Sequence, residues 1–173
     1  MVAELKHCCD VTAASLPSLV PLIDDGGFVL WESNAIVRYL LARHAPGRLY
    51  PDDLQQRFDA ERWMDWQQTT LNRAGREAFI QLIRTPPERR DAGKIAHSVA
   101  LTTVLLSTLD RHLGERAYMA GGTLTMGDIP LACEMHRWFG LPMEHASYAN
   151  VQRWYGGILA LPAARGVLDL PLS

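Results

Sequence analysis

Residues 20–36 have the sequence VPLIDDGGFVLWESNAI, and this stretch decides how the chain folds. Two apolar runs, Leu19–Ile23 and Phe28–Trp31, flank the four-residue turn Asp24–Gly27. The two glycines of that turn supply the positive φ angles that a tight reversal needs. The pattern therefore predicts a β-hairpin that leads directly into a helix beginning at Ser33.

The start of this helix predicts an anion-binding site. The first turn of a helix leaves several peptide N–H groups unpaired, with about half a positive charge between them. The Ser33 hydroxyl adds a hydrogen bond, and the Glu32 carboxylate offers a negative charge to a cation on the same ligand. A site of this kind suits the carboxylate and ammonium of a free amino acid end. In the alternative interpretation, Ser33 is an ordinary helix cap beside a solvated acid.

The rest of the chain predicts an α+β fold that is mainly α. The first helix is expected over Ser33–His44, because Pro46 and Gly47 end it. From Leu54 onward the apolar residues recur with a period near 3.6, which indicates an all-helical bundle. We therefore expect a hairpin-plus-helix domain over residues 1–45, a linker over residues 46–53 and an all-α domain over residues 54–173.

Four helices are expected in the bundle. Thr125 and Asp128 form a capping box for the third, with Leu124 and Ile129 at the staple positions. The last helix should turn Tyr148, Val151, Tyr155, Ile158 and Leu159 inward. The four ranges are Leu54–Arg84 with a kink at Asn72–Gly75, Glu88–Gly114, Met126–Phe139 and Ser147–Leu161.

Composition excludes several classes of protein. The 173 residues are 48% hydrophobic, and their formal net charge of −2 argues against nucleic acid as a partner. No apolar run approaches the ~20 residues that cross a bilayer, and the N-terminus does not resemble a secretory signal. Three cysteines, Cys8, Cys9 and Cys133, make no even disulfide framework and no metal-ligand motif. We expect a cytoplasmic protein with no membrane partner and no metal.

Three features of the chain together resemble the cytosolic glutathione transferases, most closely the bacterial, theta-like members. They are the hairpin with Val-Pro in its first strand, the helix that opens ESNAIVRYL, and the helical remainder with its Thr-x-x-Asp box. The resemblance covers Leu19 to the C-terminus. It implies a partial thioredoxin-like domain followed by the all-α transferase domain. It also implies glutathione as co-substrate, a hydrophobic small-molecule electrophile and a homodimer.

The resemblance assigns roles to residues of the hairpin and the first helix. Pro21 would be a cis-proline that exposes the main chain of Val20 to the cysteinyl backbone of glutathione. Ser33 would bind the γ-glutamyl carboxylate and Glu32 the γ-glutamyl amino group. The first long helix of the bundle would line the electrophile pocket, with Trp66 and Arg73 as candidates, although core packing is the default role of a tryptophan.

The family also places a β-α-β unit before the hairpin, with a catalytic Ser, Tyr or Cys in it. Such a unit needs ~30 residues, and 18 precede Leu19. We therefore expect this unit and its thiol-activating residue to be missing, which leaves the catalytic residue unknown. Ser15, Ser18, Cys8 and Cys9 are conceivable substitutes without a supporting motif. The leading hypothesis is a glutathione-conjugating enzyme, and the alternative is a non-catalytic binding or scaffold module of the same fold.

Overall fold

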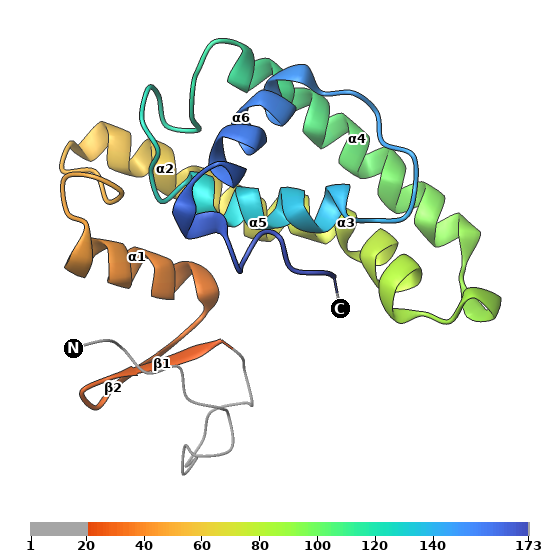
Figure 1. Ribbon diagram of the computed structural model, residues 1–173, viewed down its shortest axis with the longest axis horizontal. Coiled ribbons are helices and arrows are strands. Elements are labelled where there is room, and N and C mark those ends of the chain that lie inside the picture. The colour runs from red at the N-terminus through yellow and green to blue at the C-terminus, as the bar shows by residue number, and fades with distance from the viewer. Residues whose placement is uncertain (1–20, 173) are drawn as a thin grey trace.

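The computed structural model describes residues 21–172. The predictions that fall on Val20, on the thiol candidates among residues 1–18 and on Ser173 lie outside the described residues. The described chain is mainly helical, as predicted, with one two-stranded antiparallel sheet (Figure 1). The sheet and α1 lie at one end of the molecule, beside the helical bundle.

The hairpin forms with a tighter turn than the sequence predicted. Strand β1 (Leu22–Asp25) pairs with β2 (Phe28–Trp31), and Asp25 lies opposite Phe28. The reversal is therefore two residues long, with φ of 64° at Gly26 and 95° at Gly27. The expected four-residue turn is wrong, because a two-residue turn with both φ angles positive matches the strand twist and leaves both aspartates in the ladder.

Helix α1 (Ser33–His44) has the predicted bounds and docks on α2 (Leu54–Trp66). The Asn34 side-chain amide donates to the Met64 carbonyl over 2.9 Å. Arg38 pairs with Asp65 of α2. A small buried cluster supports this contact, and it comprises Ala60, Met64, Ala120 and Met126 with Val37, Leu41 and Tyr50 packed against them. The helix that begins at Ser33 is thereby fixed against the bundle.

The predicted long helix is one helical path with two π-helical turns. After α2 come the π-helical turn η1 (Gln67–Leu71), α3 (Asn72–Phe79) and a second π-helical turn η2 (Ile80–Arg84). The expected kink at Asn72–Gly75 is misplaced, because the irregularity is the wide turn just before Asn72. Gly75 lies inside α3, where a Cβ would meet the Trp138 ring at 3.6 Å.

Helix α4 (Ala92–Gly114) packs against α3 and α6. It begins later than predicted, because a short 3-10 turn η3 (Pro87–Arg89) precedes it and Asp91 caps it by accepting from the Lys94 N–H. Its buried stripe contains Ser98, Thr102, Leu106, Leu109 and Leu113. By length and composition alone α4 could cross a membrane, a test that core helices of soluble proteins also pass.

Helices α5 (Asp128–Phe139) and α6 (Ala149–Leu159) complete the bundle, and the short turn η4 (Pro162–Ala164) follows. Both helices begin two residues later than predicted. On α6 the inward assignment of Leu159 is wrong, since its side chain is 40% exposed, whereas Trp154 is 2% exposed. The indole of Trp154 turns inward because it donates a hydrogen bond to the buried Asp128 carboxylate.

Candidate functional site

The N-terminus of α1 is uncapped and strained. Ser33 is its first residue, no side chain of the described part of the chain caps this end, and its first turn has no acidic residue. Glu32, just before it, has φ of 71°, and it is the one non-glycine residue among residues 21–172 with a positive φ. Side chains disfavour this conformation by about 1–3 kcal/mol, and it persists where surrounding structure enforces it. Both residues are exposed, so the free N–H groups and the Glu32 carboxylate are accessible to a ligand.

Ser33 opens onto a cleft of about 190 Å³ between α1, the η1 turn and α5. Helix α1 contributes Ser33 and Asn34 to its lining, and α5 contributes Cys133, Glu134 and Arg137. The α1 terminus is therefore not an isolated surface feature, because residues of the η1 turn and α5 form the opposite wall.

A buried carboxylate organises that wall. Glu134 is 5% exposed and accepts hydrogen bonds from the side-chain amides of Gln67 at 3.0 Å and Asn72 at 3.1 Å. Arg137 lies 3.5 Å from the same carboxylate oxygen. These contacts join α5 to both ends of the η1 turn. They account for a π-helical turn at this position, because the wide turn places both amides on the side that faces α5.

Sequence reasoning missed this cluster. Gln67 and Glu134 are polar residues at buried positions of their helices, at 5% exposure each. A polar residue inside a predicted apolar stripe is the signal that could have identified them, since buried polar groups need hydrogen-bond partners.

Cys133 is the one cysteine among residues 21–172, and it lines the cleft. It reaches the surface, yet desolvation by the surrounding atoms raises the pKa of its thiol, and the neighbouring Glu134 carboxylate raises it further. The thiol therefore stays protonated near neutral pH and is a poor nucleophile.

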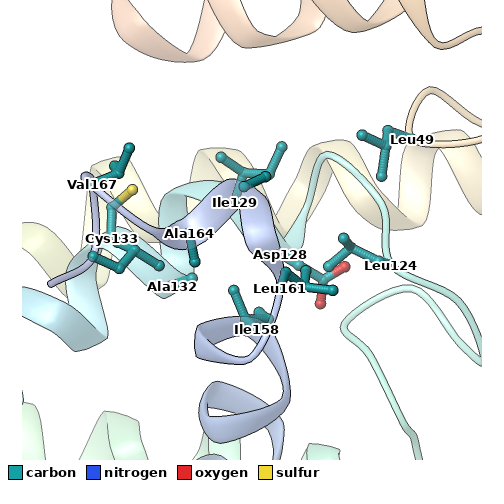
Figure 2. A pocket seen from close by; sticks show the side chains of 12 residues that line it. Leu49, Leu124, Asp128, Ile129, Ala132, Cys133, Ile158, Leu161, Ala164 and Val167 are labelled. Atoms are coloured by element: carbon teal, nitrogen blue, oxygen red, sulfur yellow. The ribbon is translucent and has the colours of Figure 1, made fainter.

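An apolar pocket of about 220 Å³ lies on the other side of Cys133. Figure 2 shows Ile129, Ala132 and Cys133 of α5 beside Ala164 and Val167 of the C-terminal segment. Ile129 and Cys133 line both this pocket and the Ser33 cleft. Helix α5 thus separates two hollows of different character.

The structure does not bring the predicted electrophile-pocket residues to the Ser33 cleft. Trp66 lines a separate hollow of about 420 Å³ with Arg62, Trp63 and Thr108. The Trp63 and Trp66 rings meet edge to face with centroids 5.3 Å apart. Arg73 is exposed on α3 and lines none of these hollows.

Pro21 is half-buried, just before β1. Within residues 21–172, no group of three or more His, Cys, Asp or Glu side chains is arranged to hold a metal ion.

Comparison with known proteins finds close relatives. The chain is 38% identical over 171 residues to glutathione S-transferase GstB of Escherichia coli, covering 98% of this chain and 82% of the relative. It is 32% identical over 136 residues to human glutathione S-transferase theta-1, covering 75% of this chain and 57% of that protein. No protein-family model matches.

A solved structure agrees closely with the fold. The theta class glutathione S-transferase of Xanthomonas axonopodis pv. citri, with glutathione bound, superposes with a TM-score of 0.87 at 38% identity, covering 90% of this chain and 75% of that one. The match to the E. coli protein covers 98% of the chain and so includes residues before Leu19. The expected absence of an N-terminal β-α-β unit is not confirmed by these matches.

Proposed function

The chain belongs to the glutathione S-transferase family, and from this premise we propose that it binds glutathione and conjugates it, through its sulfur, to a hydrophobic electrophile. One observation of the structure supports the proposal most directly. The uncapped start of α1 lies at the edge of a cleft, and Glu32, whose backbone is strained, directly precedes it.

The α1 terminus would hold the γ-glutamyl end of glutathione. The Ser33 hydroxyl and the peptide N–H groups of the first turn donate to the carboxylate, where the helix dipole favours negative charge. The Glu32 carboxylate pairs with the ammonium of the same end. Pro21, with Val20 outside the described residues, would present main-chain groups to the cysteinyl backbone.

Conjugation requires the thiolate, and an unperturbed thiol with a pKa of about 8.5 is only a few per cent ionised at neutral pH. Each unit by which a donor lowers that pKa corresponds to about 1.4 kcal/mol. We assign none of residues 21–172 to this role. The residues assigned above bind and orient glutathione, which supplies the effective concentration of its sulfur.

Calorimetric titration with glutathione tests the binding assignment. Replacing Ser33 with alanine should weaken binding about tenfold to a hundredfold, since a hydrogen bond to a charged group contributes about 1.5–3 kcal/mol. Ser107 provides the matched control, because its exposed hydroxyl donates only to the Thr103 carbonyl within α4. Equal glutathione affinity in Ser33→Ala and Ser107→Ala would refute the assignment.

Turnover is a separate question from binding. The rate with a generic aromatic electrophile, compared with the uncatalysed rate of free glutathione, decides it. Glutathione binding without any acceleration would support the scaffold module in place of the enzyme.

We propose a cytoplasmic homodimer as the working state. Large apolar side chains are exposed on β2, α2 and α4, and they comprise Phe28, Trp31, Leu54, Phe58, Leu101 and Val104. Their burial between two copies would be favourable at roughly 25 cal/mol per Å². Sedimentation equilibrium at micromolar concentration should therefore give twice the chain mass, and a monomer there would contradict the proposal.

A further inference from the structure

A further hollow, of about 460 Å³, lies between α3, η2, α5 and the C-terminal segment. Its lining combines charge with apolar surface. The cationic residues are Arg76, Arg84 and Arg137, and the apolar ones include Phe79, Leu170 and Leu172. None of the described residues that line it is acidic. A hollow of this composition favours a ligand that is apolar over most of its body and anionic at one end.

Phe79 forms the base of this hollow and orients two of the cations. The Arg137 guanidinium lies 4.3 Å from the centre of the Phe79 ring, and that of Arg84 lies 5.2 Å from it. A guanidinium stacked on a ring keeps its N–H edge available for a carboxylate. Arg137 also forms an ion pair with Glu134, with 3.5 Å between a guanidinium nitrogen and a carboxylate oxygen. Arg76 is exposed, and no carboxylate of residues 21–172 pairs with it.

The C-terminal segment is held over the hollow. The Nε2 atom of His136 lies 2.9 Å from the Leu170 carbonyl oxygen, which links α5 to this segment. Leu170 and Leu172 of this segment contribute apolar surface to the lining of the hollow.

The hollow adjoins the proposed glutathione cleft, because Arg137 lines both. The Arg137 side chain therefore forms a wall that the two hollows share. We propose that this hollow binds the electrophile and selects one with an aromatic or alkyl body and a carboxylate or sulfonate group. The body packs on Phe79 and the C-terminal leucines, and the anion pairs with Arg76 and Arg137. The inference rests on the proposed function and specifies its substrate class.

The reaction is a displacement when the probe is a benzylic chloride. The glutathione sulfur forms a bond to the benzylic carbon, the C–Cl bond breaks, and chloride leaves with the electron pair. The thiol proton passes to solvent. No oxidant or further reactant is needed.

Paired substrates test the inference. We would measure kcat/KM for 4-(chloromethyl)benzoate and for the neutral 4-methylbenzyl chloride. Arg76→Gln and Arg137→Gln should each lower kcat/KM for the carboxylate about tenfold, as expected for loss of a charge-assisted hydrogen bond. In Arg76→Gln, where the changed residue does not line the Ser33 cleft, kcat/KM for the neutral substrate should change less than about twofold. Arg137→Lys should recover part of the loss seen in Arg137→Gln because the charge is retained. Arg111→Gln, in the last turn of α4, makes the same charge change away from the hollow.

An inert ligand gives a readout that does not depend on conjugation. Calorimetry with 2-naphthoate should show binding that weakens about tenfold in Arg76→Gln and weakens with added salt, since salt screens the ion pair. The protein could bind 2-naphthoate, lose that binding in Arg76→Gln and yet fail to bind glutathione. This result would support the hollow as a binding site and overturn the proposed function. Alternatively, the wild type and every variant could act equally on both substrates, with no binding of 2-naphthoate. This result would refute the hollow as the electrophile site and leave the proposed function standing.

Discussion

Replacing Asp128 with alanine should remove about 3–5 kcal/mol of the free energy of unfolding. The Asp128 side chain is fully buried. One carboxylate oxygen accepts from the Met119 N–H and the Trp154 indole, both at 2.9 Å. The other accepts from the Thr125 N–H at 2.8 Å and from the Thr125 hydroxyl at 3.2 Å. The carboxylate therefore joins the loop before α5 to α6.

The magnitude follows from the donors that alanine would leave behind. Three buried N–H groups would lose their acceptor, at about 1–3 kcal/mol each. Removing the carboxylate also removes its desolvation penalty, which offsets part of this loss. Desolvation is the largest influence on the Asp128 pKa and raises it, so this offset is real. The net loss stays well above that of an exposed cap.

Asp110 provides the matched comparison. Its carboxylate accepts from the N–H groups of Asn150 at 2.8 Å and Val151 at 3.0 Å at the start of α6, in a partly buried setting. Asp110→Ala should therefore cost about 0.5–2 kcal/mol, the usual range for a helix cap. Urea denaturation followed by circular dichroism, with linear extrapolation, measures both. A loss for Asp128→Ala no larger than that for Asp110→Ala would refute the argument from burial.

Burial raises the pKa of Asp128 above 3.8, so ionising this carboxyl group costs more free energy in the folded protein than in the unfolded chain. Relative to Asp128→Asn, the wild type should therefore lose stability as the pH rises from 3.8 through that raised pKa. Urea titrations that show no such trend would contradict this. Glu32→Gly should raise the free energy of unfolding by about 1 kcal/mol, because it removes a side chain at φ of 71°. The same variant should bind glutathione more weakly in the calorimetric titration. A loss of stability would argue against backbone strain at this position. Gly127→Ala should lower the free energy of unfolding by about 1–3 kcal/mol, because the new Cβ would lie 2.8 Å from the Ala60 carbonyl oxygen. Gly156→Ala, in α6, should raise it by about 0.5–1 kcal/mol, because a Cβ there would have nothing within 4 Å. Similar melting curves for the two variants would refute the packing argument.

Local signals in the chain were sufficient for the hairpin and for α1. Two adjacent glycines after an apolar run predict a reversal, and the Pro46-Gly47 pair predicts the end of the helix at His44, as the structure shows. Both signals act through backbone dihedral preferences of a few residues, which hold in any surroundings. The tight two-residue turn was missed because the aspartates, common in turns, pair as strand residues.

Helix interiors were less accessible to the same reasoning. The periodicity around Leu54–Arg84 indicates helix, but it does not say that a turn widens at Gln67–Leu71. That widening depends on Glu134, which is 67 positions from Gln67 along the chain. The burial of Trp154 likewise depends on its contact with Asp128, 26 positions away.

By itself the sequence determined the order of elements, the hairpin, the bounds of α1 and the residues Glu32 and Ser33 at its start. Only the tertiary structure decided which side chains face that start and that Arg76, Arg84 and Arg137 surround one hollow. The physical reason is that hairpins and helix ends depend on backbone preferences between neighbours in the chain. The cleft, the Glu134 cluster and the cationic hollow instead depend on contacts between helices, and those exist only once the helices have packed.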